Sequence, residues 1–226
     1  MTVTSRSTVR RWGAGTAAIA RLLIASDTPL TGVAIAAAVG VTQPRASQVL
    51  RQFAEQQAVR ATEDGYVGLP ESLLDLYRQR ARPSLAHPES TWYSTRPVLD
   101  QARRITQLAA ERNGRVAFSA DLGPDLLVPW RHPTLTIVYL GDGLDLIEAG
   151  LVPAEGRPDA TLIVRWTKDT TLLTPNPAWP VEVEDIPLAD PVQQWADLFD
   201  LDGEDRHEAA GRLRRAIVDR TLASSP

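Results

Sequence analysis

The chain has 226 residues, a formal net charge of −4 and no cysteine. This length leaves room for two small domains, and the lack of cysteine excludes disulfide bonds and thiolate chemistry. No apolar run approaches the roughly 20 residues that cross a membrane, and no secretory signal pattern opens the chain, so we expect a cytoplasmic, nucleoid-associated protein without a membrane partner. Residues 1–82 hold ten arginines and six acidic residues, whereas the remainder is acidic. This asymmetry favours contact with nucleic-acid phosphates through the first part of the chain.

The first third of the chain predicts three short helices followed by a β-hairpin. Residues 16–26 carry an apolar stripe at helical spacing. Residues 31–53 predict two short helices joined by a tight turn, in which Gly40 ends the first helix and Thr42 is the N-cap of the second. Residues 58–69 predict a hairpin, because Asp-Gly precedes a Tyr/Val run. This order is typical of a winged helix-turn-helix, which places the second helix of the pair in the DNA major groove.

The second helix of this pair has distinct inward and outward faces. At 100° per residue, Ala46, Val49 and Phe53 share the side that packs on the other helices. The opposite side carries glutamine and arginine but no carboxylate over its first three turns. We expect Gln48 and Arg51 to read bases there, since arginine pairs bidentately with guanine and glutamine with adenine. The alternative is a solvated helix face that happens to be polar.

Further polar residues are expected to contact the DNA backbone. Three residues at the start of the second helix would set its register on phosphates, one arginine on the wing would assist them, and an N-terminal arm would follow the backbone or a minor groove. The alternatives are a frayed terminus and a wing arginine that only pairs across strands. The residues are Thr42, Arg45, Ser47, Arg60, Arg10 and Arg11.

The remainder of the chain predicts one more helix, a linker and a mixed domain. Residues 70–82 predict a helix that completes an N-terminal domain over residues 1–82, and the Pro/Ser-containing stretch 83–95 predicts a linker. Residues 96–226 predict a mixed α/β domain with a small sheet, so the predicted fold class is α+β. Its predicted helices are 97–112, 144–149, 191–199 (capped by Asp190) and 204–222, and its predicted strands are 134–140, 160–166 and 181–186.

Catalytic and metal-binding patterns are missing from the sequence. The three histidines lack metal-ligand spacing, Ser119 lacks the Gly-x-Ser-x-Gly elbow, and neither phosphate-loop nor dinucleotide motif occurs. Asp142 and Asp145 follow a predicted strand and could hold Mg²⁺, but three positions apart in a glycine-rich turn they fit turn shaping and helix capping better. We therefore predict a protein without enzymatic activity, metal or cofactor.

Two later motifs carry a resemblance to a known family. Arg-Val-Ala-Phe-Ser-Ala-Asp-Leu at residues 115–122 and Ile-Pro-Leu-Ala-Asp-Pro-Val-Gln-Gln-Trp-Ala-Asp-Leu at residues 186–198 are followed by a helix rich in Ala, Arg and Glu. With the predicted N-terminal domain, this order resembles the AbiEi-type antitoxins of type IV toxin–antitoxin systems. The resemblance implies a repressor of its own operon, encoded beside a nucleotidyltransferase-like toxin and forming no stable complex with it. The DNA contacts it implies fall on Gln43, Arg45, Ser47, Gln48 and Arg51.

Two alternative functions remain open beside the DNA-binding repressor. The first is a regulator whose C-terminal domain senses a small ligand or a partner protein, with Trp130 and Trp166 lining a pocket. The second is an enzyme centred on Asp142 and Asp145. Self-association on repeated DNA sites is compatible with the leading prediction, because winged helices bind DNA both as dimers and as monomers.

Overall fold

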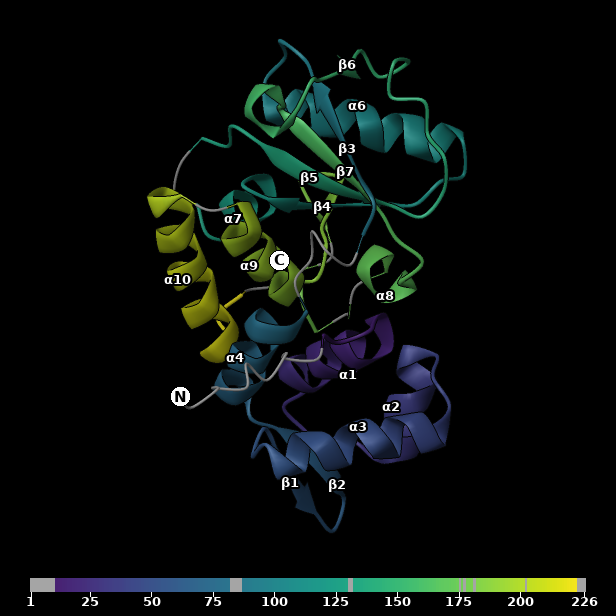
Figure 1. Ribbon diagram of the computed structural model, residues 1–226, viewed down its shortest axis with the longest axis vertical. Helices are drawn as coiled ribbons and strands as arrows, with labels where there is room; N and C mark the ends of the chain where they lie inside the picture. The colour runs from purple at the N-terminus through teal and green to yellow at the C-terminus, as the bar shows by residue number, and fades with distance from the viewer. Residues whose placement is uncertain are drawn as a thin grey trace, which may run out of the picture.

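The computed structural model describes residues 11–81, 87–129, 132–174, 176, 178–180, 182–201 and 203–222. The protein is mixed α and β, as predicted, and its largest sheet has five strands. In Figure 1 the sheet occupies the upper part of the molecule, and the first helices, drawn in purple and blue, form the lower part with a small hairpin at the bottom.

Three helices open the described chain, close to their predicted positions. They are α1 (Ala14–Ala25), α2 (Gly32–Val39) and α3 (Gln43–Glu55). Gly40 follows α2 with a left-handed φ of +71°, which glycine adopts without Cβ strain. Thr42 stands at the N-cap of α3 as predicted, but its side chain makes no capping hydrogen bond there.

An antiparallel hairpin follows α3, as predicted. Its strands are β1 (Val59–Thr62) and β2 (Gly65–Gly68). Tyr66 of β2 exchanges two backbone hydrogen bonds, of 2.9 and 3.0 Å, with Leu30 between α1 and α2. Gly68 lies so close to α1 that a Cβ atom on it would overlap the carbonyl group of Leu23. The hairpin is therefore held against the helices by backbone contacts.

The close approach at Gly68 gives a stability prediction. Gly68→Ala forces the hairpin away from α1, and we expect the free energy of unfolding to fall by about 1–3 kcal/mol, the usual cost of overpacking. Urea denaturation of the purified variant measures this loss. Gly143→Ala is the matched control, because a Cβ atom there meets nothing within 4 Å. Equal stability of the two variants would contradict the close packing of β2 on α1.

Helix α4 (Pro70–Arg80) leads from the hairpin toward the five-stranded sheet. The sheet strands, in spatial order, are β4 (Val116–Ala120), β5 (Thr136–Leu140), β7 (Leu162–Trp166), β3 (Glu89–Tyr93) and β6 (Val152–Pro153). Strands β5 and β7 are parallel, and the other neighbours are antiparallel. Alternate residues along β4, β5 and β7 face opposite sides of the sheet, and both sides are buried.

Helices cover both faces of this sheet. Helix α6 (Val98–Glu111) packs its apolar stripe on one face. The short helix α8 (Thr170–Leu173) and α9 (Pro191–Leu201) lie on the other face, where the side chains of Tyr139 and Arg165 point. Helix α7 (Leu122–Leu127), the 3₁₀ turn η1 (Arg157–Asp159) and α10 (Glu204–Val218) complete the described elements, together with the small hairpin given below.

Three predictions for this half are wrong. The stretch 83–95 is predicted as a linker, but β3 within it pairs with β7 and β6, because Thr91, Trp92 and Tyr93 favour strands despite the flanking prolines. Residues 144–149 do not form the predicted helix, since a run of turns covers residues 146–150. The predicted strand 181–186 is broken into a hairpin of β8 (Glu182–Val183) and β9 (Ile186–Pro187), since both residues between these strands have positive φ.

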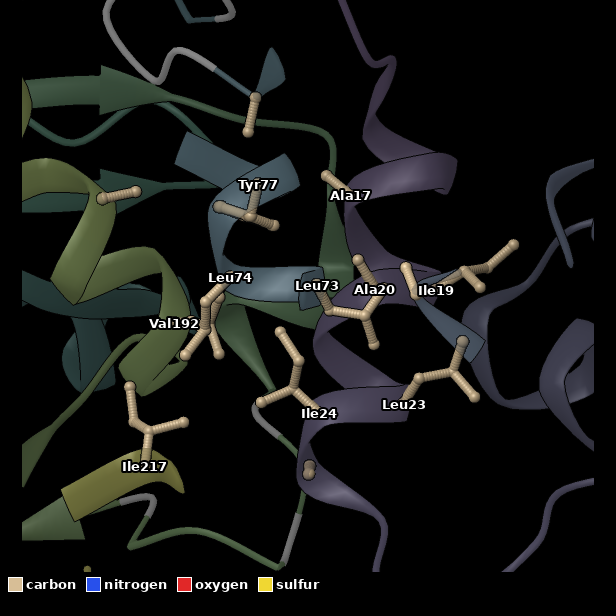
Figure 2. Close-up of a cluster of buried hydrophobic side chains, with 14 of the residues drawn as sticks. Ala17, Ile19, Ala20, Leu23, Ile24, Leu73, Leu74, Tyr77, Val192 and Ile217 are labelled. Atoms are coloured by element: carbon tan, nitrogen blue, oxygen red, sulfur yellow. The ribbon is translucent and has the colours of Figure 1, made fainter. Parts of the chain in front are cut away.

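The hydrophobic core runs without a break from the first helices into the last ones. Leu74 and Tyr77 of α4 lie between Ala20 and Ile24 of α1 on one side and Val192 of α9 on the other (Figure 2). The same cluster includes Leu213 and Ile217 of α10. Burial of these apolar side chains fixes α1 and α4 against the helices of the C-terminal half.

Candidate nucleic-acid interface

Helix α3 presents the polar face that its sequence predicts. Ala46, Val49, Leu50 and Phe53 are buried, at 0–1% exposure. The outward side chains of Gln43, Ser47, Gln48 and Arg51 are exposed. The first carboxylate along α3 is Glu55, at its last residue. Four buried apolar residues thus hold a helix whose exposed side offers amide, hydroxyl and guanidinium groups.

Arg51 and the hairpin arginine Arg60 are available to an external partner. Arg51 forms no hydrogen bond or ion pair with any residue that the structure describes. Arg60 lies on β1 opposite Val67 and is exposed. Within the described part of the chain, no acidic group neutralises either arginine through an ion pair.

Arg45 is predicted to contact a phosphate, but in the structure its guanidinium group already donates to two side chains. Its Nη1 atom donates to Gln48 Oε1 at 2.7 Å, and its Nη2 atom donates to Thr16 Oγ1 of α1 at 2.9 Å. Bidentate pairing of Gln48 with adenine needs both its amide oxygen and its amide nitrogen. That oxygen already accepts a hydrogen bond from Arg45, which orients the Gln48 amide and leaves one lone pair of the oxygen for a base.

The predicted residues divide into separate groups in space. Arg11, Arg45 and Gln48 line one cleft of about 410 Å³ along the flank of α3. Gln43, Ser47, Arg51 and Thr42 are not among the residues lining this cleft. Arg10 lies outside the described residues, and Arg80, which no sequence motif singles out, joins the cleft from α4.

A buried ionic cluster lies on the face of the sheet that α8 and α9 cover, and no local sequence motif predicts it. Arg165 of β7 is fully buried; its Nη1 atom donates to Asp197 at 2.5 Å, its Nε atom donates to Glu89 at 2.7 Å, and its Nη2 atom contacts Asp200. Ser119 donates to Asp197 at 2.5 Å. Arg165, Asp197 and Ser119 are all 0% exposed. We interpret the cluster as a structural one, because a substrate would have to displace packed core to reach it.

A second chain of polar contacts links the N-terminal helices to the sheet. Arg21 of α1 donates to Tyr77 at 2.8 Å and to Asp169 at 2.7 Å. Tyr77 donates to Gln193 at 2.6 Å, and Gln193 donates to Tyr139 at 2.8 Å. Burial raises the pKa of Tyr139 well above its ordinary value, so its hydroxyl stays protonated. These hydrogen bonds satisfy polar groups at the junction that burial would otherwise penalise.

Asp190 precedes α9 at the same junction. Its Oδ1 atom accepts a hydrogen bond from Val192 N at 2.9 Å, which confirms its predicted capping role. Burial raises its pKa to about 6, although the charge of Arg21 and the backbone hydrogen bond oppose that rise. The folded protein therefore binds a proton at Asp190 at a pH where the unfolded chain does not.

This raised pKa gives a pH-dependence prediction. The pKa of Asp190 is higher in the folded than in the unfolded chain. The contribution of Asp190 to the free energy of unfolding therefore falls as pH rises from about 4 to about 6. We expect Asp190→Asn to match the wild type near pH 4 and to exceed its free energy of unfolding by about 2–3 kcal/mol at pH 7, since asparagine still caps a helix. Urea denaturation at both pH values checks this, and a pH-independent difference would contradict it.

Two other candidates from the sequence, Asp145 and His87, contact backbone groups. The prediction that Asp145 caps a helix is wrong, because no helix follows it; its carboxylate accepts a hydrogen bond from the backbone of Ile147 at 3.0 Å within a turn. The ring of His87 lies 3.2 Å from the carbonyl oxygen of Trp166, and burial lowers its pKa. Within the described ranges, no group of three or more potential metal ligands occurs, and no helix is long and apolar enough to span a bilayer.

Comparison with known proteins returned no relative: no protein-family model, no curated protein and no solved structure matches this chain.

Proposed function

We propose that residues 14–68 form a winged helix-turn-helix and that the protein is a sequence-specific, double-stranded DNA-binding transcriptional repressor. The observation that carries this proposal is the exposed face of α3, which offers Ser47, Gln48 and Arg51 without a carboxylate before Glu55. A helix with such a face fits the major groove, where these groups pair with base edges. The neighbouring hairpin supplies the wing.

The proposed division of labour follows the chemistry of each side chain. Arg51 reads guanine, because its guanidinium group is unpaired within the described residues and can donate two parallel hydrogen bonds. Gln43, Ser47 and Gln48 contact bases or phosphates near it. Arg60 on the hairpin neutralises phosphates. The acidic overall charge does not oppose this, because the field near the contact surface governs association.

Within this proposal, the biological role is that of an autoregulating antitoxin of a type IV toxin–antitoxin operon. The resemblance in residues 115–122 and 186–198 supports this role. The antitoxin would lack enzymatic activity and bind its operator, with self-association on repeated sites and without a stable complex with the toxin.

Selection from a random-core duplex library tests DNA recognition without assuming an operator sequence. Duplexes retained by the protein through successive rounds are sequenced, and a defined motif that also occurs upstream of its own gene is the expected result. Retention of duplexes without any shared motif would contradict a sequence-specific repressor.

A second candidate function is ligand-controlled regulation, and one observation favours it. A cleft of about 350 Å³ lies between α1, α2 and α8, lined by Arg21, Leu22, Val39, Thr171 and Asp190 among others. Its volume falls within the range of small-molecule sites. The expectation of a pocket at Trp130 and Trp166 gains no support, since Trp130 lies outside the described residues. A thermal-shift screen tests this candidate, because a ligand of the folded state raises the melting temperature.

A further inference from the structure

Three arginines from separate segments meet in the cleft along the flank of α3. Arg11 comes from the segment before α1, Arg45 from the first turn of α3, and Arg80 from the last turn of α4. Among the described residues that line the cleft, Glu55 is the one carboxylate, and Gln48, Gln52 and Gln56 add amide groups. Three arginines against one glutamate leave the lining with a net charge of +2, so the cleft favours an anion.

The segments that carry these arginines are fixed in place before any ligand binds. The backbone nitrogen of Trp12 donates to the carbonyl oxygen of Arg80 at 2.9 Å, which joins the segment before α1 to the end of α4. The Trp12 ring packs against Phe53 and Tyr77, with centroid separations of 5.2 and 6.0 Å. Such preorganisation reduces the entropy that is lost when a ligand binds.

Arg80 lines the cleft without a side-chain partner among the described residues. The Nε atom of Arg80 is buried and has no hydrogen-bond partner among the described residues. The Arg80 side chain forms no hydrogen bond or ion pair with any residue that the structure describes, so the rest of its guanidinium group is available to an oxygen from outside the chain. Arginine donors favour phosphate oxygens over neutral acceptors, because the resulting hydrogen bonds are charge-assisted.

We propose that this cleft binds the phosphate backbone of one DNA strand beside α3, with Arg80 as a phosphate-contacting residue. This inference rests on the proposed DNA-binding function and adds a contact on the α3 flank that Arg11 and Arg45 share. The α3 lining runs from Arg45 to Glu55, about 15 Å of helix at 1.5 Å per residue. That length suits a run of backbone better than one small anion. A free nucleotide offers the same phosphate chemistry, so the test separates the two sources.

The test compares Arg80→Gln with Arg78→Gln on the same helix. Arg78 stacks over the Phe199 ring, 5.2 Å from its centroid, and does not line the cleft. Fluorescence anisotropy with a selected duplex and with a scrambled one, at several salt concentrations, measures both affinities. We expect Arg80→Gln to weaken binding of both duplexes equally, by about 5- to 10-fold, and to lower the salt slope by about one. Arg78→Gln should leave both quantities unchanged.

The melting temperature of each variant shows whether it folds as the wild type does. A second variant tests the cleft at a residue other than Arg80. Arg11→Gln, in the segment before α1 that lines the same cleft, should reproduce the uniform loss. Wild-type affinity in Arg80→Gln, or an equal loss in Arg78→Gln, would overturn the inference while leaving the proposed function intact. Failure of the wild type to bind either duplex would overturn both. Stabilisation of the wild type but not of Arg80→Gln by a deoxynucleoside monophosphate would assign the cleft to a free nucleotide instead.

Discussion

Arg165→Met is expected to cost about 3–5 kcal/mol of the free energy of unfolding, the range measured when one partner of a buried ion pair is removed. Arg165 is fully buried and contacts three carboxylates, those of Glu89, Asp197 and Asp200. Methionine fills much of the same volume but leaves Asp197, which is 0% exposed, without its cationic partner. Chemical denaturation followed by circular dichroism measures the loss.

The same substitution at an exposed arginine is the matched control. Arg112 and Glu148 form an ion pair at 2.6 Å whose side chains are 60% and 46% exposed. Water and salt screen such a pair, so Arg112→Met should unfold at the same denaturant concentration as the wild type. If Arg165→Met were equally stable, the buried cluster would have no part in holding β3, β7 and α9 together.

Arg51→Ala is expected to lower affinity for the selected duplex by about 1–3 kcal/mol, roughly 5- to 150-fold, and to relax the preference at one base pair. The reason is that a base-reading arginine contributes to one position of the motif, whereas a phosphate contact weakens all sequences alike. Arg51 is exposed and does not hold the fold, so the melting temperature of the variant should match that of the wild type. Titration of the motif and of its single-base variants measures both effects.

Arg104→Ala removes the same charge from the exposed side of α6 and serves as the control. It should retain the full base preference, and any loss of affinity should be the same for every duplex. An unchanged affinity and preference in Arg51→Ala would show that the outward face of α3 does not read DNA.

The parts of the fold that depend on local sequence were predictable. The apolar positions Ala46, Val49 and Phe53 define the inner face of α3 through helical spacing alone, and Gly40 marks the end of α2 through its backbone preference. The hairpin at residues 59–68 follows from Asp-Gly between strand-forming residues. Each of these signals lies within about ten residues of the feature that it determines.

The features that depend on distant residues were not predictable from one sequence. Strand β3 exists because β7, some 70 residues later, pairs with it, and local composition suggested a linker. Arg165 gains its role from Asp197 and Glu89, which lie 32 and 76 positions away. Likewise, Arg80 joins the cleft beside α3 only because the segment at Trp12 pairs with the end of α4.

Sequence recognition through α3 is tested most directly by a fluorescence anisotropy titration of the protein against its own upstream region. A scrambled duplex of equal length is titrated beside it, and both titrations are run at two salt concentrations. A repressor that reads sequence through α3 should bind the upstream duplex at least about a thousandfold more tightly than the scrambled one, with a preference that persists at the higher salt concentration. Equal affinities that disappear together as salt rises would contradict sequence recognition by this protein.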